Sequence, residues 1–364
     1  MLKLILRREA STLMLYLTPL LAIALTMISG MILFLFLGKD PVQAIAVIFI
    51  NPLFSTYSLS ELLVKACPLI LIAIGLSFGF RAGVWNIGAE GQYTLGALSG
   101  GAVALAFYDV PGFWLLPLMG LAGIVGGMAW AAIPALLRTR FNANEILVSL
   151  MLVYVAILLL SYLVSGPLKD PDGLNFPESR LFHDAATLPI LFEGTRTHIG
   201  ILIALGAAFI AALLIGKHMI GFQIKVLGQA PRAARFAGFS ETRIVWTCMM
   251  ISGGLAGLAG MLEAAGPVGQ LVPALPVGYG FTAIIVAFLG RLNPIGIVLG
   301  GLVMSLTYIG GESAQIEMGM PSAVTSVFQG MLLFYLLATD VLIKYRISFG
   351  HGRAADGAKG GVGG

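Results

Sequence analysis

The sequence predicts an all-α polytopic membrane protein with about ten transmembrane helices. Of its 364 residues, 58% are hydrophobic and only 10% are charged, and the mean hydropathy is +0.96. Water-soluble domains carry about a quarter charged residues, so this chain is too apolar to be one of them. Stretches that approach the roughly 20 apolar residues of a membrane-crossing helix recur along most of the chain.

Ten apolar segments are expected to cross the membrane. The first is longer than the apolar core of a signal peptide, so it is expected to be retained as a span. The eighth and ninth are short and are separated by Arg291-Leu292-Asn293-Pro294. The expected spans are residues 16–38, 59–80, 92–108, 113–137, 146–165, 198–216, 244–265, 279–290, 295–309 and 323–343.

The positions of Lys and Arg predict the orientation of these spans. If the N-terminus is cytoplasmic, 16 basic residues fall on the cytoplasmic side and 4 outside, with Lys65 within the second span. This asymmetry favours two cytoplasmic termini. Joining the eighth and ninth spans would place the basic C-terminal end outside, so two separate spans are preferred. The net charge of +4 is therefore interpreted as a consequence of basic residues that set the orientation in the membrane, and not as a sign of nucleic-acid binding.

A single transmembrane domain is expected over residues 1–345. Residues 166–197, rich in Pro and acidic residues, predict an external loop or cap, and residues 217–243 predict a basic cytoplasmic loop. Residues 346–364 are expected to form a disordered cytoplasmic tail. Small residues repeat in 96–101, 120–127 and 253–260, which predicts helices whose backbones approach closely.

Residues 80–92, Phe-Arg-Ala-Gly-Val-Trp-Asn-Ile-Gly-Ala-Glu-Gly-Gln, interrupt the apolar sequence between two spans. Unpaired backbone groups are costly in hydrocarbon, so this run must line an enclosed cavity or lie at the membrane surface. Asn86 and Gln92 can donate and accept hydrogen bonds, Glu90 adds a carboxylate, and Trp85 offers a flat face for stacking. One interpretation is a broken span that faces a polar cargo, and the alternative is an ordinary turn. Arg81 is interpreted as an anchor at the membrane surface.

A second motif lies in the basic loop, at residues 225–239. Pro231 suits the first turn of a helix and Gly238 suits its end, so a short surface helix is predicted. Basic residues beside apolar ones fit either a protein docking surface or an interfacial helix on anionic lipid.

Together the two motifs resemble the permease subunits of ABC importers, in the family that covers branched-chain amino acids, simple sugars and nucleosides. The string at residues 82–92 is most similar to the nucleoside, or purine nucleoside, branch. The resemblance implies the type II fold of vitamin B12-type importers. It also implies a substrate pathway lined by Trp85, Asn86, Glu90 and Gln92. The residues expected to dock on an ATPase are Pro231, Arg232, Arg235, Phe236 and Gly238, with Phe236 or Phe239 as the apolar anchor.

The resemblance implies a transport subunit and not an enzyme. It implies no cofactor in this chain, with ATP and Mg bound by a partner ATPase that has two nucleotide-binding halves. A paralogous second permease and a periplasmic or lipoprotein solute-binding protein would complete the importer in the bacterial cytoplasmic (inner) membrane. A nucleoside is the expected cargo and a monosaccharide the alternative. An ion-coupled secondary transporter is less favoured, because few carboxylates lie within the spans.

Three acidic residues lie in or near the expected spans and have separate interpretations. Glu61 and Lys65 are four residues apart and predict a helix-stabilising pair. Glu145 opens the fifth span, where a carboxylate offsets the helix dipole. Glu263, near the external end of the seventh span, is a candidate pathway residue, with a structural role slightly preferred. The four histidines show no metal-ligand spacing and the Gly-Lys pairs lack the rest of a phosphate loop, so neither a metal site nor ATP hydrolysis is expected.

Overall fold

The computed structural model describes residues 2–6, 12–110, 112–173 and 175–349. The chain divides into two compact units, one formed by residues 1–41 with 330–364 and the other by residues 42–329. Eight of the described helices are long and apolar enough to cross a membrane. Apart from helices, the described residues contain one two-stranded sheet, so the prediction of a helical multi-pass membrane protein is confirmed.

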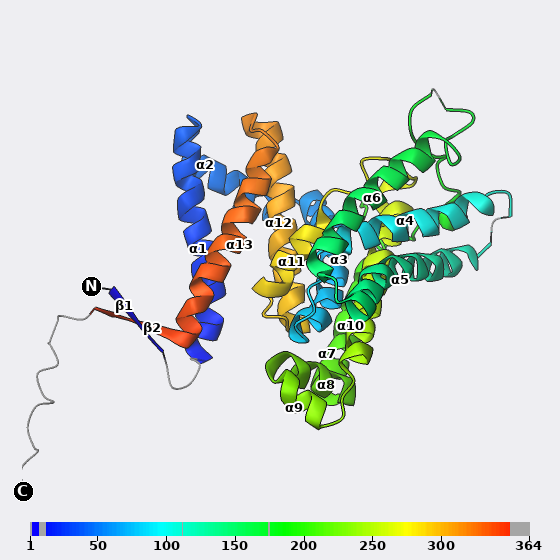
Figure 1. The fold of residues 1–364 in the computed structure, drawn as a ribbon. Helices are drawn as coiled ribbons and strands as arrows, with labels where there is room; N and C mark the ends of the chain where they lie inside the picture. Colours follow the sequence, from blue (N-terminus) through cyan, green and yellow to red (C-terminus); the bar gives the residue numbers. More distant parts are fainter. Residues whose placement is uncertain (1, 7–11, 111, 174, 350–364) are drawn as a thin grey trace, which may run out of the picture. The chain divides into compact units, whose positions relative to one another are not determined.

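Residues 42–329 contain a helix for each expected span from the second to the ninth (Figure 1). These are α3 (Thr56–Arg81), α4 (Ala89–Ala106), α5 (Leu115–Phe141), α6 (Glu145–Ser165), α7 (Gly200–Lys217), α10 (Glu241–Glu263), α11 (Tyr279–Leu289) and α12 (Pro294–Met318). A π-helical turn, η4 (Ala264–Val268), extends α10. The helices α4 and α11 are not among the eight that are long and apolar enough to cross a membrane.

The prediction for the ninth span was wrong in length, because α12 continues to Met318 instead of stopping at residue 309. The residues beyond 309 include Glu312, Ser313 and Gln315, so the end of the apolar stretch does not mark the end of this helix. The helix ends where Gly319 adopts a left-handed φ of +61°. Residues 41–54 also form short helical turns that were not expected: α2 (Pro41–Ile45), η1 (Ala46–Ile50) and η2 (Asn51–Phe54).

The predicted break between α11 and α12 is confirmed. Arg291 and Leu292 both have a φ of +57°, which no helix accommodates. Asn293 then caps α12, because its Oδ1 accepts a hydrogen bond from the Ile295 N–H at 3.0 Å. Pro294 occupies the first position of the helix, where its missing N–H costs no hydrogen bond.

The core of residues 42–329 is built from α3, α4, α5 and α10. Its helices touch through glycines, as the repeated small residues predicted. A Cβ at Gly257 of α10 would collide with the carbonyl of Gly123 on α5 and lie 2.9 Å from the Gly127 Cα. A Cβ at Gly260 would collide with the carbonyl of Tyr93 on α4. Close backbone approach therefore replaces large side chains at these crossings.

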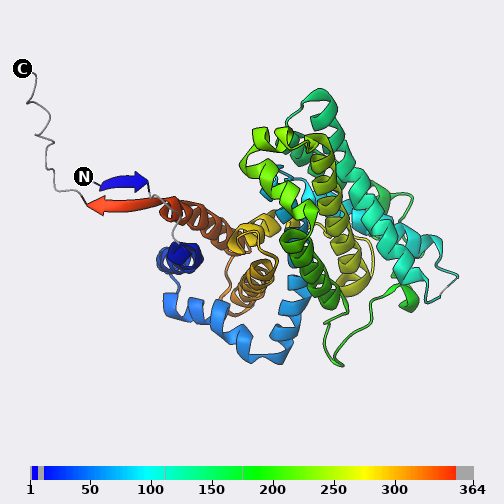
Figure 2. The ribbon, with the colours of Figure 1, turned by 90° about the horizontal axis from the view of Figure 1, so that it is seen from below.

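The segment between α6 and α7 and the segment after α7 lie at opposite ends of residues 42–329 (Figure 1). The first contains the short turn η3 (Asp184–Ala186), and the second contains α8 (Met219–Gln229) and α9 (Pro231–Phe236), which Figure 2 shows from below. The two segments are joined by α7, whose 18 residues span about 27 Å. That length is close to the thickness of a bilayer core.

The other unit contains α1 (Thr12–Phe36), most of α13 (Ala323–Lys344) and the two strands. The Thr339 hydroxyl donates to the Thr18 carbonyl at 3.3 Å, so α1 and α13 are in contact. Strand β1 (Leu2–Leu6) pairs antiparallel with β2 (Tyr345–Phe349), with Leu2 opposite Phe349. Residues 346–349, predicted to be disordered, therefore form a strand because the other end of the chain supplies its hydrogen-bonding partner. Residues 350–364 of that predicted tail lie outside the described residues.

Candidate functional site

The predicted interruption at residues 80–92 separates α3 from α4. Residues 82–88 lie between the two helices, and Gly83 has a left-handed φ of +73° that favours glycine. The Val84 N–H returns to the Gly79 carbonyl at 2.9 Å. We call residues 81–92 the break segment.

Asn86 and Gln92 bond to each other inside the protein. Asn86 is 2% exposed and Gln92 is 1% exposed. Asn86 Nδ2 donates to Gln92 Oε1 at 2.8 Å and to Ser252 Oγ of α10 at 2.9 Å. In return, Gln92 Nε2 and the Gly88 N–H each donate to Asn86 Oδ1 at 3.1 Å. Both donors of the Asn86 amide are thus used within the chain.

Glu90 is 1% exposed and bonds to the start of α11. Its carboxylate accepts hydrogen bonds from the backbone N–H of Gly278 at 2.7 Å and from the N–H of Gly280. A carboxylate at this position interacts favourably with the positive end of the helix dipole. Gly280 is required here, because a Cβ would collide with the backbone of Glu90.

Arg81 bonds to the turn that follows the other end of α11. Its Nε and Nη2 donate to the Leu292 carbonyl at 3.1 and 2.9 Å. The sequence suggested only a membrane-surface anchor, whereas the structure gives this guanidinium a specific protein acceptor. The break segment therefore contacts α11 at both ends.

Trp85 is the only one of the four predicted pathway residues that is appreciably exposed, at 39%. Its ring lies 5.0 Å from Phe80 and 5.9 Å from Phe288 of α11, measured between ring centroids. The structure thus brings Trp85, Asn86, Glu90 and Gln92 into one segment. Three of these side chains point into the protein, and their role in a substrate pathway stays a prediction.

The predicted surface helix at residues 231–238 is confirmed as α9, with Pro231 at its first position and Gly238 at a φ of +78°. Phe236 is 93% exposed, whereas Phe239 packs edge-on against Phe222 of α8 at 6.2 Å. The structure thus leaves Phe236 exposed, whereas the half-buried Phe239 contacts α8. Arg232 is exposed, and Arg235 forms an exposed ion pair with Glu241 at 3.3 Å.

The helix α8 was not predicted, and it connects α9 to the break segment. A Cβ at Gly228 of α8 would collide with the carbonyl of Arg81. The end of α3 thus lies directly against α8, and the same residue bonds to the turn after α11 through its side chain.

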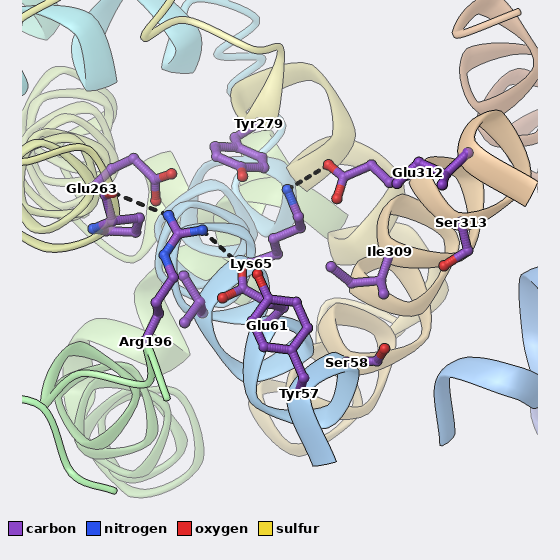
Figure 3. Close-up of a pocket in the computed structure, with 13 residues that line it drawn as sticks. Tyr57, Ser58, Glu61, Lys65, Arg196, Glu263, Tyr279, Ile309, Glu312 and Ser313 are labelled. Carbon is purple, nitrogen blue, oxygen red and sulfur yellow. Dashed lines mark hydrogen bonds and ion pairs between the residues drawn. The ribbon is translucent and has the colours of Figure 1, made fainter. Parts of the chain in front are cut away.

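A pocket of about 280 Å³ opens among α3, the end of α10 with η4, α11, α12 and the segment before α7 (Figure 3). It was not predicted from the sequence. Its lining residues are Tyr57, Ser58, Glu61, Val64, Lys65, Arg196, Glu263, Pro267, Tyr279, Ile309, Glu312, Ser313 and Ile316.

The charged residues of this pocket correct one prediction. Glu61 and Lys65 do not form the expected ion pair with each other. Glu61 Oε2 lies 3.4 Å from Arg196 Nη1, and Lys65 Nζ lies 2.8 Å from Glu312 Oε1. Both side chains face the pocket, where charged groups from other elements provide closer partners.

Residues 58–337 match the protein family described as "Branched-chain amino acid transport system / permease component". The chain belongs to this permease family. The glucose ABC transporter permease TsgB13 of Haloferax volcanii is 38% identical to it, over 97% of this chain and 95% of the relative. The resemblance inferred from the two motifs is confirmed.

Two further relatives carry the names of nucleoside transporters. The guanosine ABC transporter permease NupP of Bacillus subtilis is 32% identical, over 90% of this permease and 94% of the relative. The nucleoside ABC transporter permease NupB of Lactococcus lactis is 29% identical, over 90% of this permease and 92% of the relative. Among solved structures, a metal-chelate type ABC transporter in an inward-facing conformation is similar with a TM-score of 0.46 and 16% identity, covering 88% of this permease and 98% of that chain.

Two carboxylate oxygens in the pocket of the permease are buried and, among the described residues, have no hydrogen-bonding partner. They are Glu61 Oε1 and Glu263 Oε2. The described part of the chain contains no group of three or more His, Cys, Asp or Glu residues placed to hold a metal ion. Glu263 was a candidate from the sequence, but Arg196 and Glu312 were missed. The one feature of the sequence that could have identified Arg196 and Glu312 is that each is a charged residue beside an apolar span.

Proposed function

We propose that this permease is the transmembrane subunit of an ATP-driven importer that carries a nucleoside. The observation that supports this cargo is similarity along most of the chain to guanosine and nucleoside permeases, at 32% and 29% identity. A monosaccharide is the second candidate, since a glucose permease is 38% identical. Both cargoes present neighbouring hydroxyl groups on a ring.

The proposed arrangement in the membrane is one domain over residues 1–345 with ten crossings, two cytoplasmic termini and the type II fold. The host membrane is the bacterial cytoplasmic membrane, and residues 166–197 are external. The 16-to-4 distribution of basic residues supports this orientation. The position of α8 and α9 at the opposite end of residues 42–329 from the 166–199 segment supports it too.

The proposed coupling surface is α9, which docks on a separate ATPase with two nucleotide-binding halves. That partner would bind ATP and Mg and carry out the hydrolysis, with this chain as the transport subunit. The exposed ring of Phe236 suits an apolar anchor, and Arg232 and Arg235 suit polar contacts beside it. The contact between Gly228 and Arg81, followed by the bond from Arg81 to Leu292, gives movement at α8 and α9 a physical route to α11.

The break segment is proposed to border the substrate pathway, which a paralogous second permease completes. Trp85 would contact passing cargo through its exposed ring. Asn86, Glu90 and Gln92 would act from behind this surface, because their polar groups already bond within the chain. A periplasmic or lipoprotein solute-binding protein would deliver the cargo.

The test of cargo is uptake into proteoliposomes that contain the complete importer, with its binding protein outside and ATP inside. Radiolabelled guanosine, adenosine, uridine and glucose are compared at equal concentrations. We expect saturable, ATP-dependent nucleoside uptake that excess unlabelled glucose does not inhibit. Glucose uptake without nucleoside uptake would overturn the nucleoside proposal in favour of the second candidate.

A further inference from the structure

We propose that the pocket in Figure 3 binds the hydroxylated ring of the cargo, with the carboxylates of Glu61 and Glu263 accepting hydrogen bonds from its hydroxyl groups. This inference rests on the proposed import of a nucleoside or sugar. It assigns a binding site away from the break segment. The ribose of a nucleoside and the ring of a monosaccharide share the chemistry that the pocket recognises.

The buried carboxylate oxygens carry the argument. Glu61 is only 7% exposed, and its Oε1 lacks a hydrogen-bonding partner among the described residues, as does Glu263 Oε2. A buried charged acceptor without a donor is costly, and the cost exceeds that of a neutral group. Both oxygens belong to residues that line one pocket, so a small rotation of each carboxyl group would offer them to donors on a single bound molecule.

The neighbouring cations position these carboxylates without using all of their acceptors. Arg196 Nη1 lies 3.4 Å from Glu61 Oε2, and Arg196 Nη2 donates to the Pro267 carbonyl at 3.1 Å. This arrangement orients Glu61 while its Oε1 has no hydrogen-bonding partner among the described residues. Lys65 is paired with Glu312 at 2.8 Å on the opposite wall. Figure 3 shows Arg196 and Lys65 between the carboxylates.

The composition of the pocket favours a neutral polyhydroxylated ring over an anion. Lys65 and Arg196 are already paired with Glu312 and Glu61, and Glu263 adds a third carboxyl group, so an anion gains no net attraction. Tyr279 and Ile309 offer apolar surfaces for the C–H faces of a sugar ring. A volume of about 280 Å³ is just below the roughly 300–1,000 Å³ of pockets for drug-sized ligands, which suits a smaller, sugar-sized group.

The location of the pocket suits the entry of cargo. Tyr57 and Ser58 are at the start of α3, Glu263 is at the end of α10, and Arg196 belongs to the segment between α6 and α7. That segment is the one proposed to be external. The pocket therefore lies where a molecule released by a binding protein would first meet the transmembrane helices.

The experiment compares cargo with and without single hydroxyl groups in the reconstituted importer. Uptake of guanosine, 2′-deoxyguanosine and 3′-deoxyguanosine is measured for the parental protein, Glu61→Gln and Glu263→Gln, with glucose and 2-deoxyglucose as the second arm. Each variant should slow uptake of the full cargo about tenfold, as expected when a charged acceptor is lost. For at least one deoxy analogue, uptake by the variant should differ from uptake by the parental protein by less than about twofold. The binding protein is the same throughout, so its own preference cancels when variants are compared.

The matched control is Glu317→Gln, which makes the same chemical change at an exposed position of α12 outside the pocket. It should transport every cargo at the parental rate. Rates are compared at equal recovery of the assembled complex and equal melting temperature. If either pocket variant fails to assemble, the other tests the site by itself.

Two results would overturn the site. One is an uptake rate equal to that of the parental protein in both pocket variants. The other is an equal loss of uptake for the hydroxylated cargo and for every deoxy analogue, which would show that the carboxylates only support the structure of the pocket. Failure of the proposed function is distinct, since the parental importer would then carry neither guanosine nor glucose. If the parental importer carries glucose and not guanosine, the site is assigned to a monosaccharide.

Discussion

Arg81 and Glu90 form hydrogen bonds at the two ends of the same helix, α11. Arg81 donates to the Leu292 carbonyl just beyond its C-terminal end, and Glu90 accepts from Gly278 and Gly280 at its N-terminal end. The break segment and α11 are therefore expected to move together. Because α8 touches the Arg81 carbonyl, this relationship also links α11 to the proposed coupling surface.

The first prediction concerns the N-terminal end of α11. Glu90→Gln removes the charge and places an amide NH₂ against one of the two backbone donors, because the remaining Oε1 can accept from only the other. We expect a loss of about 1–3 kcal/mol of stability, as for a charged hydrogen bond that is broken in a buried site. Thermal unfolding of the purified complex measures the effect, with Glu317→Gln as the matched exposed control. An unchanged melting temperature would show that Glu90 does not stabilise this helix.

The second prediction separates two roles for Arg81. Arg81→Lys keeps the positive charge but lacks the planar guanidinium whose Nε and Nη2 both donate to the Leu292 carbonyl. We expect normal membrane insertion and uptake that is several-fold slower. A residue that only anchors the helix at the membrane surface would tolerate lysine, so parental uptake would contradict the structural role.

The third prediction tests α9 as a docking surface. Phe236→Ala removes a ring that is 93% exposed, so the melting temperature should not change, while recovery of the ATPase and uptake should both fall. Phe239→Ala is the comparison, because that ring packs against Phe222 and its loss should lower stability instead. Arg235→Glu should also reduce ATPase recovery, since it reverses a charge beside the same surface. Full ATPase recovery in Phe236→Ala and Arg235→Glu would place the contact elsewhere.

The fourth prediction concerns orientation. Thiol labelling of cysteines introduced on either side of the membrane measures it. Ser179 in the segment proposed to be external is a poor position for such a cysteine, because it is 1% exposed and its hydroxyl accepts from the Leu271 N–H at 2.9 Å. A cysteine at the exposed Glu193 should react with an impermeant thiol reagent in intact cells. A cysteine at Ala237 should react only after permeabilisation, and the native Cys67 and Cys248 are buried. The reverse pattern would invert the proposed topology.

The fifth prediction tests the close helix crossing at Gly257. Gly257→Ala should destabilise the permease by about 1–3 kcal/mol, because the added methyl group collides with the backbone of α5. Gly206→Ala in α7 is the control, since nothing lies within 4 Å of the added atom. That substitution should be neutral or slightly stabilising. Equal melting temperatures for both variants would contradict tight packing between α10 and α5.

The sequence by itself determined the helical membrane class, the helix in each apolar segment and the two interruptions at residues 81–92 and 290–294. These features depend on local properties. Apolar runs favour membrane helices, glycine permits left-handed backbone, and proline starts a helix but cannot continue one. The same local signals identified α9 through Pro231 and Gly238. They failed at the end of α12, where polar residues continue a helix that packs on the protein.

Only the tertiary structure decided which polar groups are partners. Their spacing in the sequence predicted that Glu61 pairs with Lys65. In the fold, Glu61 instead pairs with Arg196 and Lys65 pairs with Glu312, both from distant segments of the chain. The sequence identified Asn86 and Glu90 as polar, but it did not show that Ser252 bonds to Asn86 or that Gly278 and Gly280 bond to Glu90. Each of these bonds joins residues far apart along the chain. Burial makes such pairing obligatory, and the packing of helices selects which groups meet.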